Sequence, residues 1–526
     1  MEKTMKKIIL SSLAALLVVG VAFMGCQNLD VTNINAPDEQ RSLATPGDVE
    51  SLIAGSFLAW HQAIFWEQPS MSLATTADVY SCSWGNFGMR DLSSEPRVKF
   101  NNTVAYGNAS VVEDPWFGCY GAISAASDGV KSIKDGVVDL GKDNHRAIAF
   151  GKFVQGLAHG YLALMFDQAF ILDETVDLTT ADLQLQPYTD VMAAAIQQLT
   201  EAIDICNSNQ FTLESEWIRG QPITNDQLAQ LAHSFIARYM VLVARDPGER
   251  QAVDWTTVMG HVNNGITADF GPESDGAEHW WDAVQWYSPQ SGTWLRADYK
   301  LIGPSDESSG YANWISTPVA NRDEFEMDTR DLRLWDQTRA TDGTQNPGSE
   351  FFFAAPSPFP VARGTYHFSR YSHQVFFDYA DSGGEGVMVL FRASELEFLK
   401  AEGMLHTGGS DAAIAAIIDQ TRMNKGGYDT AVGAPVGSIS DDANPKAGAS
   451  LWVMLKYERH IDLLGTFSGV GLWDRRGWGE LTTNTMLHFP VPAQDLETLQ
   501  LGLYTHGGGT GASAPKLGAN RSARPY

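Results

Sequence analysis

Long stretches with apolar residues at three- and four-residue spacing run through the first half of the chain. Side chains at this spacing line one face of an α-helix, where they can pack against another helix. We therefore expect a mainly α fold. The expected helices begin just after Pro46 and then cover about 116–134, 145–166, 188–206, 226–245 and 252–267.

The stretch over 145–166 is expected to be a buried helix. Gly156, Gly160 and Ala163 lie along it and would let a neighbouring helix approach closely. Lys152 and His159 interrupt its apolar pattern, which argues against a membrane-spanning segment.

The second half of the chain changes character twice. Residues from about 270 to 385 are rich in Gly, Pro, Ser, Trp and Tyr, and this segment is too long for one structureless loop, so we expect loops with short helices or strands. Helices then return. Ser394 with Glu397 offers a capping box, Gly408 and Gly409 end that helix, and Ser410 can cap the next one. Such helix pairs suggest a helical-repeat architecture, although no fixed-period repeat is visible in the sequence.

The N-terminus has the pattern of an export signal. Three lysines precede an apolar run over 8–24, and the run ends in "FMGC". This ending resembles the lipobox of bacterial lipoproteins, which predicts cleavage after residue 25 and lipidation of Cys26 with several acyl chains such as palmitate. The alternative is an ordinary secreted protein in which Cys26 is buried. Residues 26–45 are polar and are expected to form a tether.

The charge balance excludes some partners. The formal net charge is −27, and removal of residues 1–25, with three Lys and one Glu, leaves 33 basic and 62 acidic residues, or −29. Binding to nucleic acid requires clustered Lys and Arg, so we expect no nucleic-acid partner, and an anionic membrane surface is equally unfavourable.

Motifs for metal binding or catalysis are missing from the sequence. The cysteines after Cys26 are Cys82, Cys119 and Cys206, which allow at most one disulfide and lack the spacing of a zinc site. Neither HExxH nor GxSxG occurs. We expect no metal and no other cofactor.

Carboxylates on the C-terminal helices allow two interpretations. A glycoside hydrolase needs only two carboxylates in the right geometry, and Glu395, Glu402 and Glu458 are candidates. Alternatively, each pairs with an arginine, such as Arg392 or Arg422, and locks two helices together. We favour structural ion pairs, because acids beside Arg on helices commonly have this role.

Several segments resemble one known family. The segment "VLFRASELEFLKAEGMLHTGGSDAAIAAIIDQTRMNKGG" is similar to a helix–turn–helix of the SusD/RagB family of outer-membrane nutrient-binding lipoproteins, and "LKYERHIDLLGTFSGVGLWDRRGWGEL" continues the similarity. "FPVPAQDLE" resembles the family's closing Phe-Pro-x-Pro element. "NLDVTNINAPD" and "PWFGCYGAISAASDGVKSI" resemble its N-terminal segments. The similar segments lie near both ends of the chain and in the family's order.

The resemblance implies a fold and a function. It implies tetratricopeptide-like helix pairs as a scaffold, a loop-rich ligand-binding region and no catalysis. It also implies a surface lipoprotein of the outer membrane that captures glycans, or in some branches peptides, for a SusC-like TonB-dependent β-barrel transporter. "LWDRRGWGEL" is then structural, with Asp474 and its arginines tying helices together and Trp473 and Trp478 in the core.

Two aromatic segments are candidates for the ligand site. Flat aromatic faces suit sugar rings, and a few planar polar groups suit hydroxyls. "YSCSWGNFGMRD" and "HWWDAVQWYSPQSGTWLRADY" hold many such residues, and the resemblance places the family's site in these two sequence regions. We expect Trp84, Trp286 and Trp294 to stack on sugar, and Asn86 and Arg90 to reach hydroxyls. The full predicted set is Trp84, Asn86, Phe87, Arg90, Trp286, Tyr287, Trp294 and Trp314.

The sequence therefore predicts a non-enzymatic surface lipoprotein that binds oligosaccharide and delivers it to a transporter. A peptide-binding member of the same family and a glycoside hydrolase are the alternatives. The expected regions are a signal peptide (1–25), a tether (26–45), an N-terminal helical region (46–270), a loop-rich aromatic region (271–385), a C-terminal helical region (386–500) and a Gly-rich tail (501–526).

Overall fold

The structure, a computed structural model, describes residues 45–276, 278–290, 294–353, 369–442, 446 and 448–508. Cys26, the predicted signal peptide and nearly all of the predicted tether lie outside these residues, as does the tail from residue 509. No helix in the described part of the chain is long and apolar enough to cross a membrane.

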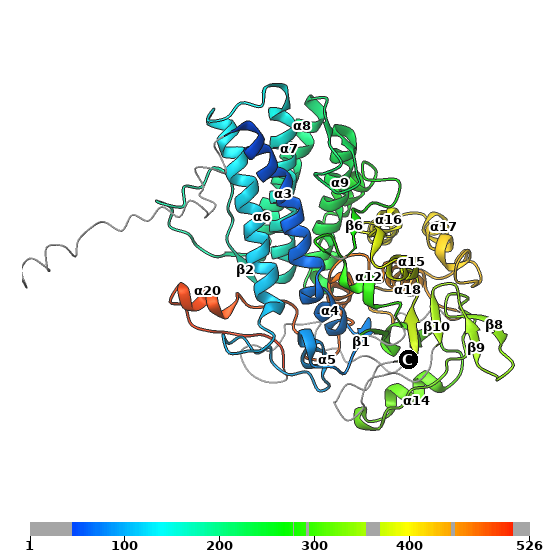
Figure 1. The fold of residues 1–526 in the computed structure, drawn as a ribbon. Helices are drawn as coiled ribbons and strands as arrows, with labels where there is room; N and C mark the ends of the chain where they lie inside the picture. The colour runs from blue at the N-terminus through cyan, green and yellow to red at the C-terminus, as the bar shows by residue number, and fades with distance from the viewer. Residues whose placement is uncertain are drawn as a thin grey trace, which may run out of the picture.

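Long helices standing side by side build the N-terminal half (Figure 1). The order of packing is α3 on α6, α6 on α7, α7 on α8 and α8 on α9, which confirms the predicted mainly α fold. Two predicted bounds shift, because α6 begins before residue 116 and the last predicted helix, 252–267, is shortened to α11; the short α10 before it was not predicted. The helices are α3 (Pro46–Phe65), α4 (Glu67–Thr76), α5 (Met89–Ser93), α6 (Ser110–Lys134), α7 (Asn144–Met165), α8 (Tyr188–Ser208), α9 (Asn225–Leu242), α10 (Pro247–Gln251) and α11 (Trp255–Val262).

Local sequence signals explain where two of these helices begin. The Thr45 side chain accepts a hydrogen bond from the Asp48 backbone N–H at 3.2 Å, and Pro46 occupies the first helical position of α3. Thr224 and Gln227 form a reciprocal capping box at the start of α9. Both arrangements satisfy backbone N–H groups that have no partner inside the helix.

The predicted close approach of helices to α7 is confirmed. A Cβ atom added at Gly156 would lie 2.6 Å from Leu199 Cγ and 2.9 Å from the Ala195 carbonyl oxygen, both on α8. A Cβ atom at Gly160 would overlap the ring of Tyr239 on α9. Only hydrogen at these two positions permits the observed spacing of the helices.

The loop-rich region contains short elements, as predicted. Its helices are α12 (Ala283–Tyr287), α13 (Tyr299–Ile302), α14 (Gly310–Ser316) and α15 (Phe377–Asp381), and short 3₁₀ turns occur at Asn86–Gly88, Gly141–Asp143, Gly303–Ser305 and Val319–Asn321. Strands in the described residues form only two-stranded antiparallel sheets. These pair β1 (Tyr80–Ser81) with β7 (Arg296–Ala297), β2 (Gln168–Ala169) with β3 (Gln186–Pro187), β4 (Thr212–Leu213) with β5 (Ile223–Thr224), β6 (Glu273–Asp275) with β12 (Glu385–Val387), β8 (Trp335–Arg339) with β9 (Gln345–Pro347), and β10 (Phe351–Phe353) with β11 (Tyr371–His373).

The C-terminal helices are α16 (Ala393–Thr407), α17 (Asp411–Arg422), α18 (Leu451–Asp462), α19 (Val470–Trp478) and α20 (Ala493–Thr498). Gly408 ends α16 in the left-handed conformation, with φ of 77°, as predicted. The predicted capping box is wrong. Arg392 is the N-cap residue, and the Ser394 hydroxyl instead donates to Asp462 on α18 at 2.5 Å. Ser410 does occupy the N-cap of α17, but its side chain makes no capping hydrogen bond.

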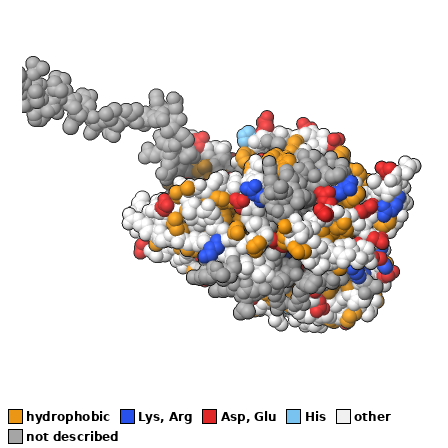
Figure 2. Space-filling view, turned by 90° about the horizontal axis from the view of Figure 1, so that it is seen from below, with side chains coloured by type: hydrophobic (Ala, Val, Ile, Leu, Met, Phe, Trp, Pro, Cys, Tyr) orange, Lys and Arg blue, Asp and Glu red, His pale blue; other side chains and the backbone are white. Residues whose placement is uncertain are grey.

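One hydrophobic core joins the three folded regions. It contains residues from Val49 on α3 to Leu496 on α20 and includes aromatic residues of the loop-rich region. A smaller cluster lies between α16, α17 and α18. The face shown in Figure 2 carries hydrophobic side chains in small groups among charged ones, so the described surface there presents no single large apolar area.

The packing of α7 gives a test of the fold. We expect Gly156→Ala to lower the free energy of unfolding by about 1–3 kcal/mol, because the added methyl group overlaps α8. Gly121→Ala on α6 is the matched control, since nothing lies within 4 Å of the added Cβ and alanine favours the helix by up to about 1 kcal/mol. Urea unfolding measures both variants. Equal effects of the two substitutions would contradict the packing described here.

Candidate ligand-binding site

The pairing of β1 with β7 brings the two predicted aromatic segments together. Tyr80 lies opposite Ala297 and Ser81 opposite Arg296 in an antiparallel register. The chain leaving β1 therefore runs beside the chain entering β7, which places Trp84 next to Trp294. Trp84 and Trp294 are 210 residues apart in sequence, and no local pattern would have revealed the register.

Half-buried rings from both segments form one group, the aromatic cluster. The rings of Trp84 and Trp294 meet edge to face with centroids 4.7 Å apart. Phe87 and Tyr287 contact Trp294 at centroid distances of 5.5 and 5.8 Å. The cluster continues through Trp281, which lies 5.8 Å from Tyr287 and 6.3 Å from Trp286. Its members are Trp84, Phe87, Trp281, Trp286, Tyr287 and Trp294.

Exposure distinguishes this cluster from the core. Trp281 is 9% exposed and serves as its base, whereas the other five rings are only partly buried. Rings of this size are normally buried, because leaving one in water forgoes roughly 1.5–3 kcal/mol. Four partly exposed rings in contact through Trp294, with Trp286 joined to them through buried Trp281, form an apolar surface suited to a flat ligand.

Polar residues of the first segment border the cluster. The backbone takes a left-handed turn at Phe87 and Gly88, with φ of 55° and 72°, and Asn86 is exposed beside it. Arg90 packs against Gly85 and forms an ion pair with Asp91 at 3.7 Å. Arg90 and Asp91 also line a surface groove of about 410 Å³. Both Asn86 and Arg90 are therefore accessible next to the rings.

One predicted site residue is corrected by the structure. Trp314 is 4% exposed, and its ring packs at 5.2 Å from Tyr299 and 6.0 Å from Tyr311. The Arg322 guanidinium lies 4.5 Å from the Trp314 ring centroid. Trp314 therefore packs in the core on α14 and has almost no ring surface for a ligand. The reason is that α14 turns this side chain toward Tyr299 and Tyr311, whereas Trp294 lies on a loop.

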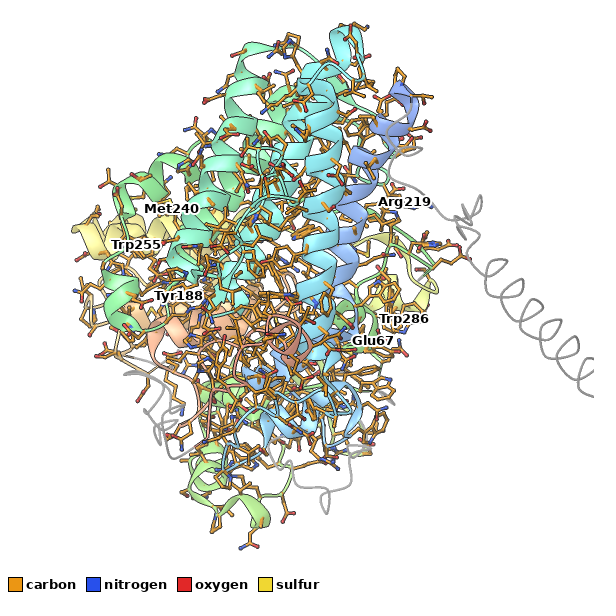
Figure 3. All side chains as sticks on the ribbon, turned by 90° about the vertical axis from the view of Figure 1, so that its left-hand side faces the viewer. Glu67, Tyr188, Arg219, Met240, Trp255 and Trp286 are labelled. Carbon is orange, nitrogen blue, oxygen red and sulfur yellow. The ribbon has the colours of Figure 1, made fainter. Side chains whose placement is uncertain are left out.

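The junction of α3 and α4 adds residues that the sequence interpretation missed. Trp66, between these helices, is 38% exposed, and Phe117 on α6 is 42% exposed. Glu67 begins α4, which packs against α12, and its negative charge contributes, after burial, to the raised pKa of Tyr287. Figure 3 shows Glu67 and Trp286 close to each other at one edge of the molecule. An interruption of the helical pattern at this point was the only sequence signal.

An internal cavity of about 30 Å³ lies deeper in the molecule and is lined by Tyr80, Asp282 and Ser468 among others. It has room for water but not for a sugar ring. Burial raises the pKa of Asp282 to about 7 there, and the Tyr80 hydroxyl lies 2.7 Å from His373 Nδ1. This cavity is separate from the aromatic cluster and too small to be the ligand site.

The carboxylates on the C-terminal helices are held in buried ion pairs. Glu395 pairs with Arg238 at 2.6 Å and Arg459 at 3.4 Å, and Glu402 pairs with Arg250 at 2.7 Å. The predicted structural role is confirmed, with arginines other than Arg392 as the partners of Glu395 and Glu402. Arg392 instead lies 3.9 Å from Asp462, and Arg422 donates to the Asp429 carbonyl at 2.8 Å.

Glu458 and Asp474 are engaged in the same way. Glu458 pairs with Arg333 at 2.7 Å, and Asp474 accepts from Arg250 at 3.0 Å and from Arg459 at 2.7 Å. Burial alone would raise the pKa of Glu402, but the charge and hydrogen bonds of Arg250, together with His406 and Trp478, outweigh burial and leave that pKa lowered. These carboxylates are buried and paired with arginine, so they cannot reach a surface ligand to serve as general acid or nucleophile.

"LWDRRGWGEL" forms most of α19 and the residues after it, and its core role is confirmed. Trp473 is fully buried and Trp478 is 1% exposed, with the Trp478 indole donating to Glu402 at 3.0 Å. Arg475 donates to the Ala77 and Lys300 carbonyls, both at 2.8 Å. These two residues flank β1 and β7, so α19 also holds the base of the aromatic cluster. Within the described residues, no group of three or more His, Cys, Asp or Glu could hold a metal ion.

Comparison with known proteins identifies the fold. No protein-family model and no curated protein matches the sequence. A SusD superfamily protein from Bacteroides thetaiotaomicron matches with 15% identity and a TM-score of 0.54 over 88% of this chain and 98% of that chain. A SusD-like carbohydrate binding protein from Bacteroides fragilis matches with 13% identity and a TM-score of 0.55 over 83% and 87%. A SusD superfamily protein from Parabacteroides distasonis matches with 15% identity and a TM-score of 0.54 over 85% of this chain and 97% of that chain. The protein has the SusD-like fold, as its motifs predicted.

The ion pairs give a second test. We expect Glu402→Ala to lower the free energy of unfolding by about 3–5 kcal/mol, because it removes a carboxylate that balances buried Arg250. Asp135→Ala breaks an exposed pair with Lys131 and should change stability little. Urea unfolding of both variants checks the difference. A Glu402→Ala protein of unchanged stability would show that this carboxylate is not structural.

Proposed function

We propose that this SusD-like protein binds a nutrient oligosaccharide at the aromatic cluster and delivers it to a SusC-like TonB-dependent transporter in the outer membrane. A lipid on Cys26 would hold the protein at the cell surface. The observation that carries the binding proposal is the contact between partly exposed rings from two distant segments, beside accessible Asn86 and Arg90. Apolar ring faces cover the faces of a sugar, and the amide and guanidinium groups bond its hydroxyls.

The fold supports this proposal without specifying the ligand. One of the matching structures is named a carbohydrate binding protein. A peptide could also use aromatic rings, and the peptide-binding alternative is tested in the same screen. The hydrolase alternative depended on carboxylates of the C-terminal helices, which are held in ion pairs with arginine. Incubation with each bound glycan, followed by chromatography, tests it, since release of shorter sugars would contradict a pure binding role.

The ring surface gives a third prediction. A glycan array followed by calorimetry should identify a bound oligosaccharide, and Trp286→Ala or Trp294→Ala should weaken its binding about thirtyfold. The reason is that truncation of an aromatic contact residue costs about 2 kcal/mol of binding free energy. Trp335→Ala is the matched control, because this partly buried tryptophan lies on β8, away from the cluster.

Stability measurements separate binding from folding. Both cluster variants should lose less stability than Trp473→Ala, a fully buried change expected to cost about 3–5 kcal/mol. If Trp286→Ala and Trp294→Ala bind glycan as well as the unchanged protein does, the aromatic cluster is not the site.

The anchor and the transporter give a fourth prediction. We expect the full chain in the outer-membrane fraction, and the Cys26→Ala variant in the aqueous fraction, because loss of the acylated residue removes the membrane affinity. Cys206→Ala is the control, since this cysteine is buried and free. A large β-barrel should co-purify from outer membrane dissolved in mild detergent. Retention of the Cys26→Ala variant in the membrane would contradict the anchor, and repeated absence of the barrel would contradict delivery.

A further inference from the structure

Glu67 occupies an unusual position at the edge of the aromatic cluster. α3 ends at Phe65, the extended backbone of Trp66 leads into α4, and Glu67 is the first residue of α4. Its side chain lies at the same edge as Trp286 in Figure 3. The Glu67 charge reaches the phenol of Tyr287 and the carboxyl of Asp114 on α6.

No cation balances this carboxylate within the described part of the chain. Glu67 is partly buried, yet none of the ion pairs and side-chain hydrogen bonds found among the described residues includes it, and only its own backbone N–H serves it. Glu174, a more deeply buried acid, is by contrast paired with Lys152 at 2.8 Å. Partial burial of an unpaired charge is unfavourable, and at the edge of the aromatic cluster, where α4 packs against α12, such a charge acts on any ligand that binds there.

The surroundings of Glu67 combine apolar rings with negative charge. Trp66 and Phe117 expose large parts of their rings. α6 lies directly against α3 here, because a Cβ atom at Gly118 would be 2.5 Å from Ala63 Cβ. This packing places Phe117 and Asp114, one helical turn apart on α6, beside the end of α3. The edge of the aromatic cluster is therefore acidic and apolar together.

We propose that Glu67 contacts the ligand at the aromatic cluster and sets its charge class, favouring neutral or amino sugars over sugars that carry carboxylate or sulfate groups. This inference rests on the proposed function. An ionised carboxylate only accepts hydrogen bonds, so it suits vicinal hydroxyl groups or an ammonium group on a sugar. An anionic sugar at the same place would bring two negative charges together in a partly desolvated site, and neither could donate a proton.

The test uses hexasaccharides that differ in charge. The neutral probes are cellohexaose, maltohexaose, mannohexaose and chitohexaose, the cationic probe is the chitosan hexamer, and the anionic probe is hexagalacturonate. Calorimetry should show at least one neutral or cationic probe binding ten or more times tighter than hexagalacturonate. Glu67→Gln keeps the size of the side chain and removes the charge. This substitution should weaken binding of the best probe about tenfold. It should also reduce the ratio between the affinity for that probe and the affinity for hexagalacturonate.

Matched variants make the result specific. Glu397→Gln changes the same residue type at a partly buried position on α16, away from the aromatic cluster, and should leave binding unchanged. Melting temperature reports folding, and Glu67→Gln should not lower it, because the removed charge has no internal partner.

Each remaining outcome contradicts either the role of Glu67, its charge preference or the proposed function. If Glu67→Gln changes nothing while Trp286→Ala weakens binding, the role of Glu67 is wrong and the proposed function stands. Tighter binding of hexagalacturonate than of every other probe overturns the charge preference alone. If no hexasaccharide of any charge binds, the proposed function fails and this inference falls with it. Release of shorter sugars that Glu67→Gln abolishes would make Glu67 catalytic and overturn both.

Discussion

Buried ion pairs between arginines and carboxylates hold the two helical regions of this protein together. Three guanidinium groups and three carboxylates meet where α9, α10, α16, α18 and α19 converge, so their formal charges cancel. Buried charge is tolerated only when every partner is in place, which requires all five helices to dock in one arrangement. The members are Arg238, Arg250, Glu395, Glu402, Arg459 and Asp474. Residues 236 positions apart in sequence, from Arg238 to Asp474, are fixed together in this way.

The same helix that closes this network also supports the candidate site. Asp474 faces the network, while Arg475, the next residue, reaches the carbonyl groups of Ala77 and Lys300. Those carbonyls lie just before β1 and just after β7, the strands that lead into the two aromatic segments. The rings pack against the main core on one side, and hydrogen bonds from a buried helix hold the strands beside them.

Local patterns in the sequence predicted the features that depend on neighbouring residues, such as the positions of helices. Apolar spacing located α6 to α9, and the C-terminal motifs indicated both the SusD-like fold and the core role of Trp473. Long-range pairing was beyond such patterns. The sequence suggested that Glu395 would find an arginine but not that Arg238, on a helix 157 residues earlier, would be the one. Trp314 and Trp294 lie in sequence segments of similar composition. Helix α14 turns the ring of Trp314 into the core, whereas the loop that carries Trp294 leaves its ring partly in water.

The tie between the aromatic segments consists of two residue pairs, Tyr80 with Ala297 and Ser81 with Arg296. The rings of Trp84, Phe87 and Trp294 lie in the loops after Ser81 and before Arg296, whereas the buried ion pairs of the C-terminal helices lie outside these loops. Substitutions in the loops therefore leave the buried ion pairs of the scaffold intact. A duplicated gene could acquire a new ligand specificity by exchanging a few loop residues. The architecture separates what natural selection must preserve from what it is free to vary.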